Sequence, residues 1–359
     1  MKGKSRLIDD NSSGWSFALP SVVLMAAFIL VPFVLSIIFS LTNQRLMSPN
    51  SADFVGLDNY RDLLSINFLV IEPLREANGD FKVDEAGELQ YPKIRNYTRN
   101  NPDYSYLKGM KEWFSFDVNK KKVAFLASDP VFMKSVVNTF IFVLVVAPLQ
   151  GGLALVLALL INQKLRGIQL FRTIYFMPVV VSIVVVSLLW RFIYDGQNGL
   201  LNSALESITF GAFKPVNWLG DPDLALGSII AMSIWQAVGF HMVIWLSGLQ
   251  TISPTLYEAS KIEGASPWQN FRYITWPGLR GTAVLVLIVI TMQAFALFAQ
   301  IDVMTGGGPL DSTQTIVYQA VERGYGKQDI SGGSAISVVL FVIVLSISLL
   351  QRYLTREKV

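Results

Sequence analysis

Long apolar runs alternate with polar stretches along the whole chain. A helix that spans the hydrocarbon core of a bilayer takes about 20 mostly apolar residues, and six runs reach that length. They predict transmembrane helices at residues 15–41, 134–163, 173–194, 224–250, 281–301 and 330–353. Prolines lie within or at the ends of these runs, where we expect kinks, at Pro20, Pro32, Pro148 and Pro178. The pattern therefore indicates an all-α membrane protein with six transmembrane helices.

Lysine and arginine in the short connections predict the orientation of these helices. Cytoplasmic connections carry an excess of both residues, whereas long translocated loops do not follow the rule. The basic segments are the amino terminus (1–14), the turn with Lys164, Arg166 and Arg172, the loop 253–277 with Lys261 and Arg272, and the tail (354–359) with Arg356 and Lys358. Both termini are therefore expected in the cytoplasm, and residues 42–133, 195–223 and 302–329 are expected outside. The first run is too long for the apolar core of a signal peptide, so we expect it to remain as an anchor.

Composition excludes several classes of function. The chain is 52 % hydrophobic and only 15 % charged, which places it in a bilayer rather than among soluble domains. It has no cysteine and one histidine, His241, so disulfides and cysteine or histidine clusters for metals are excluded within the chain. The formal net charge of +3 offers no concentrated basic face, and no nucleic-acid partner is expected.

The polar loop 253–277, called here the elbow loop, has the local chemistry of two short helices joined by a glycine turn. Ser253 and Pro254 predict a helix start, because a serine oxygen caps free amides and proline presets φ at the first helical position. Gly264 suits the left-handed residue that ends a helix, and Ser266 begins a capping-box pattern for the next one. The apolar face expected on the first helix consists of Leu256, Ala259 and Ile262.

Six positions of the elbow loop keep a fixed spacing: Glu258, Ala259, Ser260, Gly264, Ile274 and Pro277. In this spacing the loop resembles the Glu-Ala-Ala loop of binding-protein-dependent ABC importer permeases. Two positions depart from the pattern, because Ser260 stands for the second alanine and Trp276 for a leucine. The alternative is an ordinary amphipathic connector between spans, but a spacing kept over so many residues rarely arises by chance.

A second pattern follows the fifth apolar run. Residues 304–309 read Met-Thr-Gly-Gly-Gly-Pro and resemble a segment typical of the sugar, polyol and glycerol-phosphate branch of these importers. Three glycines and a proline predict a tight turn with close approach at the exit of a helix. A phosphate cradle is the alternative interpretation, but no Gly-Lys-Ser/Thr follows the glycines.

The first two apolar runs are separated by a stretch too long to be a simple loop. Its flanks, residues 54–60 and 129–139, resemble segments that lie close together in shorter sugar-importer permeases. Residues from about 66 to 128 are therefore interpreted as an extracytoplasmic insertion after the first helix, with enough aromatic residues for a small folded module. Two roles stay open for it: a cap that docks the binding protein, and a structured spacer.

The resemblance implies the type I ABC importer permease fold and a chain without catalytic residues. No Walker motif occurs, so ATP and Mg²⁺ are expected on a partner ATPase and no cofactor or metal on this chain. In the family, the short helix of the elbow loop sits in a groove of the ATPase; Glu258 would pair there, Ala259 would permit close approach and Gly264 would make the turn. The implied partners are a second permease subunit in a heterodimer, two ATP-binding subunits, an extracytoplasmic solute-binding protein and membrane lipid. The implied location is the prokaryotic plasma (inner) membrane.

Polar and aromatic residues within the predicted spans are candidates for substrate contacts. Amides, hydroxyls and aromatic faces hold uncharged hydroxylated ligands, and the candidates are Ser182, Trp235, Gln236, Phe240, Gln293, Phe295 and Gln300. Each of them fits hydrogen bonding or packing between helices equally well. His241 fits a hydrogen-bonded packing residue better than a ligand or a proton relay.

Three classes of function remain to be compared. An ion-coupled transporter is expected to show membrane-embedded charges or an inverted repeat, and neither is visible. A membrane-embedded enzyme needs clustered acidic or nucleophilic groups at one membrane face, where the elbow loop offers only Glu258 and Glu263. The sequence therefore favours the permease subunit of an ATP-driven importer, which moves a sugar or related polyhydroxylated solute from an external binding protein into the cytoplasm.

Overall fold

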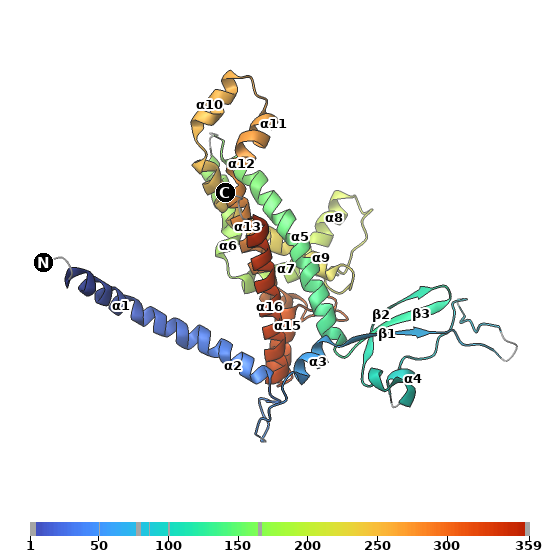
Figure 1. Ribbon diagram of the computed structural model, residues 1–359. Helices are drawn as coiled ribbons and strands as arrows, with labels where there is room; N and C mark the ends of the chain where they lie inside the picture. The colour runs from blue at the N-terminus through green and yellow to red at the C-terminus, as the bar shows by residue number, and fades with distance from the viewer. Residues whose placement is uncertain are drawn as a thin grey trace. The chain divides into compact units, whose positions relative to one another are not determined.

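The computed structural model describes residues 5–49, 51–76, 80–85, 87–99, 101–163 and 167–355. The basic residues Lys164, Arg166, Arg356 and Lys358, on which part of the predicted orientation rests, lie outside the described residues. The chain divides into two compact units (Figure 1). One comprises residues 1–63 and 320–339, and the other comprises residues 64–319 and 340–359.

In the first unit, the amino-terminal apolar run forms helices α1 (Ser5–Met25) and α2 (Val31–Ser40), joined by a π-helical turn at Ala26–Leu30. The wide turn immediately precedes Pro32, which has no N–H to donate to the preceding turn. The irregularity expected at this proline is therefore present. A short helix α3 (Asp58–Leu64) follows, and the unit also contains the first turns of α16 (Ile330–Thr355).

Asp329 fixes the start of α16 in the first unit. Its Oδ1 accepts a hydrogen bond from the amide of Gly332 at 2.9 Å, and its Oδ2 accepts one from Arg323 Nε at 2.7 Å. The Thr42 hydroxyl lies 3.1 Å from the Ser331 hydroxyl, so the end of α2 and the start of α16 are joined. Helix α15 (Ile316–Val321) and a π turn at Glu322–Gly326 lead into this region.

In the second unit, helices α5 (Pro130–Ile161), α9 (Ala225–Thr251) and α13 (Arg280–Phe295) pack around a common apolar core. Phe142, Met242 and Ile290, one from each helix, are at most 2 % exposed. The indole of Trp245 on α9 donates to the Gly151 carbonyl of α5 at 3.1 Å. These three helices form the frame on which the other segments of the unit are placed.

The third predicted span is a broken helix rather than a straight one. Helix α6 (Ile168–Val180) and helix α7 (Ile183–Ile193) meet at an angle of 97°. Val181 and Ser182 adopt extended backbone conformations between them, three residues after Pro178, where the sequence predicted only a kink. Val186 closes the first turn of α7 by donating its amide to the Ser182 carbonyl at 3.0 Å.

The fifth predicted span, residues 281–301, is also interrupted. Helix α13 ends at Phe295, and a new helix α14 (Ala299–Met304) begins after Phe298, whose φ of −131° and ψ of −63° are not helical. At its other end α13 meets the elbow loop at 67°. Among the described residues, four helices are long and apolar enough to cross a membrane, or up to six if each bent pair is one span.

The expectation of an all-α chain is wrong for residues 66–128, called here the external module after their predicted location. Strands β1 (Ile66–Ile71), β2 (Lys111–Val118) and β3 (Lys121–Ala127) form an antiparallel sheet in the order β1-β3-β2. The Ser128 amide donates to the Ser65 carbonyl at 3.2 Å, so the two ends of the module meet close to the predicted limits. A short helix α4 (Arg95–Thr98) and a 3₁₀ helix (Pro102–Leu107) complete it.

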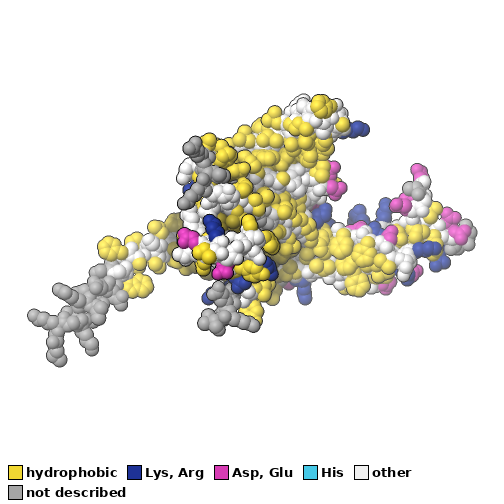
Figure 2. Space-filling model, turned by 90° about the horizontal axis from the view of Figure 1, so that it is seen from above, with side chains coloured by type: hydrophobic (Ala, Val, Ile, Leu, Met, Phe, Trp, Pro, Cys, Tyr) yellow, Lys and Arg dark blue, Asp and Glu magenta, His cyan; other side chains and the backbone are white. Residues whose placement is uncertain are grey.

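The sheet of the external module has two apolar faces. One packs into a small core with Leu69, Leu107 and Leu126. On the other, the rings of Phe114 and Phe125 stack with centroids 4.6 Å apart, and Phe114 is 41 % exposed. Figure 2 shows hydrophobic side chains gathered over this region of the chain and charged side chains toward its far end.

The loop after α7 carries a short lateral helix, α8 (Leu200–Ile208). Asn202 organises the loop, because its Nδ2 donates to the Val216 carbonyl at 2.9 Å and its Oδ1 accepts from Trp218 Nε1 at 2.8 Å. Asp195, just after α7, accepts hydrogen bonds from the amides of Asn198 and Gln197, which lower the pKa of its carboxyl group.

A substitution at Gly239 on α9 tests how closely α6 packs against α9. A Cβ at this position would overlap the Tyr175 carbonyl oxygen, so Gly239→Ala forces the two helices apart, which costs about 1–3 kcal/mol for an overpacked contact. Gly227→Ala in the same helix is the matched control, since nothing lies within 4 Å of its added carbon. We expect the first variant to lower the midpoint of thermal aggregation in detergent and the second to leave it unchanged or slightly raised. Equal midpoints for the two variants would contradict the close packing.

Candidate functional site

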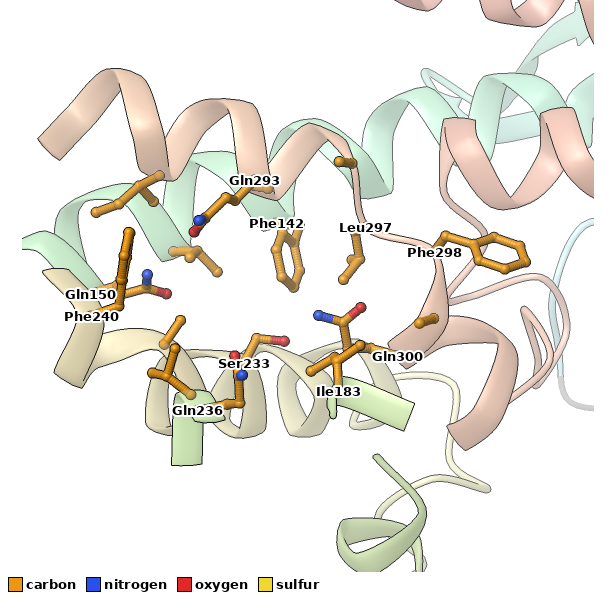
Figure 3. Close-up of a pocket in the computed structure, with 17 residues that line it drawn as sticks. Phe142, Gln150, Ile183, Ser233, Gln236, Phe240, Gln293, Leu297, Phe298 and Gln300 are labelled. Carbon is orange, nitrogen blue, oxygen red and sulfur yellow. The ribbon is translucent and has the colours of Figure 1, made fainter. Parts of the chain in front are cut away.

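A cavity of about 530 Å³ lies among α5, the α6–α7 break, α9 and the segment from α13 to α14 (Figure 3). None of the 17 residues that line it is ionisable. Its polar groups come from Gln150, Ser233, Gln236, Gln293 and Gln300, and its rings from Phe142, Phe240 and Phe298. The cavity is therefore uncharged, with amides set among apolar and aromatic walls.

The amides converge on one space. In Figure 3 the side chains of Gln150 and Gln300 point into the same space from opposite sides and Gln293 points toward Gln150, whereas the Phe298 ring points away. Ser233 adds a buried hydroxyl that has no hydrogen-bond partner among the described residues. Such a group remains available to a ligand or to water, because a buried hydroxyl without a partner is costly.

The side chain of Gln150 contacts the imidazole of His241. It is 3 % exposed, and its Nε2 lies 2.8 Å from Nδ1 of His241, which is fully buried on α9. His241 Nδ1 also lies 2.9 Å from the Ala237 carbonyl oxygen, one turn earlier. Nδ1 serves one of these two groups at a time, because it either accepts from the Gln150 amide or donates to the Ala237 carbonyl. This placement agrees with the interpretation of His241 as a hydrogen-bonded packing residue.

The interruption between α13 and α14 supplies much of the cavity wall. Backbone groups freed inside a membrane must find partners within the protein, and irregular backbone occurs there only where it is buried or lines a cavity. The Leu297 carbonyl, freed by the interruption, accepts a hydrogen bond from the Thr315 hydroxyl at 2.9 Å. The break is therefore stabilised by a residue from the following loop.

Helix α5 fixes that loop in turn. Asn138 Nδ2 donates to the Gln314 carbonyl at 3.0 Å and to the Asp311 carbonyl at 3.3 Å. The hydroxyl of Thr139, which is 1 % exposed, accepts from the Ile316 amide at 3.0 Å. Asn138 and Thr139, near the start of α5, thus hold the loop whose Thr315 hydroxyl pairs with the freed Leu297 carbonyl.

The glycine segment 304–309 forms the tight turn predicted from sequence. Gly306 and Gly307 have φ of +58° and +81°, and a Cβ on Gly307 would overlap the side chains of Gln314 and Tyr318. The Thr313 hydroxyl donates to the Gly308 carbonyl at 2.7 Å. Neighbouring side chains fill the space against the glycines, so the geometry favours a packed turn over a phosphate cradle.

Four of the predicted substrate contacts line the cavity: Gln236, Phe240, Gln293 and Gln300. The other three do not. Ser182 lies in the break before α7, and Phe295 is 2 % exposed and packs edge-on against Phe140 at 5.7 Å. Trp235 contacts the Trp190 ring at 5.3 Å and is otherwise exposed. The sequence interpretation missed Gln150 and Ser233, and the signal for Gln150 was a lone amide within an apolar run.

The elbow loop has the predicted order of helix, glycine and helix. It contains α10 (Pro254–Ile262), α11 (Pro267–Asn270), a π turn (Phe271–Thr275) and α12 (Trp276–Gly278). Gly264 has a φ of +72°, and Ser266 forms the capping box with Gln269, with N–H···O distances of 2.7 and 3.3 Å. The predicted cap by Ser253 is wrong, because its hydroxyl lies 2.8 Å from the Thr255 hydroxyl and caps no amide.

The elbow loop exposes the face that was predicted to be apolar. Leu256 and Ile262 are 51 % and 86 % exposed, and Glu258 and Ala259 are exposed with them. The Tyr257 hydroxyl lies 2.9 Å from that of Thr275, which ties α10 to the second half of the loop. Ile274 is half-buried and Pro277 is exposed at the start of α12. Figure 1 shows α10 and α11 at one end of α5 and the three-stranded sheet at the other.

A second cavity, of about 580 Å³, lies within the external module and has the opposite character. Basic side chains dominate its lining, with Arg95, Arg99, Lys108 and Lys111 against the single carboxylate of Glu112. That carboxylate already lies 3.2 Å from Lys122 Nζ. The cavity among the helices is therefore uncharged, whereas the cavity of the external module is lined mainly by basic side chains.

Comparisons with known proteins agree with this architecture. The family model described as "Binding-protein-dependent transport system inner membrane component" matches residues 150–358. The chain is 32 % identical over 247 residues to the probable ABC transporter permease protein YurN of Bacillus subtilis, covering 67 % of this chain and 84 % of that protein. It is 36 % identical to the trehalose/maltose transport system permease protein MalF of Thermococcus litoralis, covering 61 % and 72 %.

A solved structure shows the same fold. It is a chain of a bacterial ABC transporter involved in the import of the acidic polysaccharide alginate, with a TM-score of 0.68 and 19 % identity over 98 % of this chain and 99 % of that one. The family match covers more than half of the chain, including the cavity residues from α9 to α14 and the elbow loop. The chain therefore belongs to the family of inner-membrane components of binding-protein-dependent transport systems, the permease subunits of ABC importers.

Proposed function

We propose that the chain carries an uncharged sugar or a related polyhydroxylated solute through the membrane, with the glutamine-lined cavity as part of the pathway. The observation that supports this most is the lining itself, which combines amides, a hydroxyl and phenyl rings without an ionisable group. Amides donate to and accept from sugar hydroxyls, and rings pack against the apolar faces of a sugar. The permease of T. litoralis, named for trehalose and maltose, is a relative whose cargo fits this chemistry.

The same lining argues against an anionic cargo. Moving a carboxylate or phosphate out of water is expensive unless a counter-charge or a dense set of donors receives it. No lysine, arginine or histidine lines this cavity. The likeness to the alginate importer is a likeness of fold, and its acidic cargo is not proposed for this chain.

Transport by this chain requires energy from partners. We propose that the elbow loop inserts its exposed helix α10 into a groove of a cytoplasmic ATPase that binds ATP and Mg²⁺. Glu258 pairs across that contact, Ala259 allows close approach, and Gly264 makes the turn, with Ser260, Ile274 and Pro277 completing the pattern. Closure of the ATPase then rocks the spans between outward-open and inward-open arrangements. The exposed apolar face of α10 and the left-handed Gly264 support this role.

The proposed assembly is that of the family. It comprises a second permease subunit in a heterodimer, two ATP-binding subunits and an extracytoplasmic solute-binding protein in a prokaryotic inner membrane. Both bent helix pairs count as spans in this proposal, which gives six spans and places both termini in the cytoplasm. The binding protein delivers the solute at the end that carries the external module, and the solute leaves at the end of the elbow loop.

Uptake by the complex with its co-expressed partners tests the pathway. We expect ATP-dependent uptake of maltose or trehalose and no uptake of alginate oligosaccharides. Gln236→Leu and Gln293→Leu each remove an amide from the cavity and should lower kcat/KM for the transported sugar about three- to tenfold, the usual worth of one such hydrogen bond. Gln169→Leu is the matched control, because Gln169 is exposed on α6 and lies outside the cavity. Uptake of the acidic oligosaccharide, or equal effects of all three substitutions, would contradict the proposed pathway.

Two substitutions test the coupling by the elbow loop. Gly264→Val forces a branched residue into a φ of +72°, and Glu258→Lys reverses a charge on the exposed face of α10. We expect both to reduce co-purification of the ATPase and to lower uptake at least about tenfold, a loss that corresponds to about 1.4 kcal/mol. Gly281→Val and Glu206→Lys are the matched controls, since Gly281 has open space around it and Glu206 lies on the lateral helix α8. Normal uptake in both elbow variants would remove the coupling role.

A further inference from the structure

A narrow groove on the outside of the second unit runs along α6. It has a volume of about 420 Å³ and is lined by Arg172, Thr173, Phe176, Met177 and Val180 of α6 and by Val243 of α9. The residues of α6 follow one another at helical spacing, so they form a single stripe. The groove is apolar along its length and carries one cation at its end.

The close packing of α6 on α9 shapes this groove. Gly239 lets the Tyr175 carbonyl approach α9, since a Cβ there would overlap that oxygen. One turn further along α9, Val243 presents a larger side chain to the groove. The two helices therefore contact each other at Gly239. Beside that contact they leave a recess between Val243 of α9 and the stripe of α6 residues that begins at Arg172.

Arg172 in this recess has no ion-pair partner among the described residues. Its Nε is buried and has no hydrogen-bond partner among the described residues. None of the ion pairs found in the described part of the chain involves it, and no acidic residue lines the groove. A guanidinium is a fork of N–H donors suited to the oxygens of phosphate, and a buried donor without a partner is costly.

We propose that this groove binds one phospholipid with an anionic headgroup, with the headgroup phosphate on Arg172 and an acyl chain along the stripe from Phe176 to Val180. The apolar lining fits a hydrocarbon chain and offers nothing to a polar solute, whereas the single cation fits a phosphate. Basic pockets between transmembrane helices are known to receive anionic lipid headgroups. In the proposed orientation of the chain, Arg172 belongs to the cytoplasmic leaflet.

The lipid is favoured over a free anion because the cation occupies only one end of the groove. A small anion would contact Arg172 and leave Phe176, Met177 and Val243 uncovered. A lipid covers both parts, so its affinity should depend on the charge and on the apolar recess together. A dependence of the affinity on both Arg172 and the apolar recess distinguishes a lipid from a small anion. It does not depend on which solute the importer carries.

Native mass spectrometry of the full chain, titrated with phosphatidylglycerol or phosphatidylcholine, tests the proposal. We expect tight binding of one phosphatidylglycerol, and Arg172→Gln should weaken that binding about tenfold, the worth of one charge-assisted hydrogen bond. Arg172→Lys should retain most of it. The matched control is Arg280→Gln, because Arg280 is an exposed arginine outside the groove, and this variant should bind as the wild type does.

A second pair of variants tests the apolar part of the groove. Val243→Trp fills the recess and should weaken phosphatidylglycerol binding, whereas Val185→Trp, at an exposed position of α7 outside the groove, should not. Excess inorganic phosphate should not displace the lipid. Equal binding of the two lipids, equal losses for Arg172→Gln and Arg280→Gln, or full displacement by inorganic phosphate would overturn the proposal, the last by showing a small-anion site.

Discussion

The Leu297 carbonyl is the backbone group on which the candidate site depends. It is freed where α13 stops, and it accepts a hydrogen bond from the Thr315 hydroxyl at 2.9 Å. Without that hydroxyl, the interruption at residues 296–298 would leave an unpaired backbone group at a cost of several kcal/mol. The interruption in turn supplies Ala296, Leu297 and Phe298 to the cavity wall and lies between Gln293 and Gln300. One side-chain hydrogen bond thus permits an irregular backbone in the wall of the cavity.

The position of Thr315 is itself set by other parts of the second unit. Asn138 and Thr139 of α5 hold the loop around residues 311–316, and the glycine turn at 306–307 brings the chain back toward α13. The start of α5 is therefore in direct contact with the loop that follows the glycine turn. Together these contacts place Thr315 beside the interruption between α13 and α14.

Local chemistry made the elbow loop predictable. Gly264 ends a helix and Ser266 caps the next one through atoms of the same few residues, so no distant partner has to be known. The length of apolar runs likewise predicted where helices lie. The helix cap predicted for Ser253 was wrong, because its hydroxyl contacts the nearby Thr255 hydroxyl and caps no amide.

Features that depend on distant partners were not predictable. The carbonyl freed by the break after Phe295 pairs with Thr315, and α6 approaches α9 closely at Gly239. The strands of the external module pair residues far apart in sequence, such as Phe68 with Phe125, and short apolar runs do not by themselves indicate a sheet. The choice between Gln293, which faces the cavity, and Phe295, which faces the core, is fixed by helix rotation that one sequence does not reveal.

In the proposed pathway the transported solute occupies the cavity at the interruption between α13 and α14. The chain has no cysteine of its own, so Ala296→Cys places a single thiol at an exposed position of that cavity. Labelling by a water-soluble thiol reagent should proceed in the assembled importer and should slow when the transported sugar is present. Ala204→Cys on the lateral helix α8 should be labelled at the same rate with or without the sugar. Labelling of Ala296→Cys that the transported sugar leaves unchanged would contradict the account.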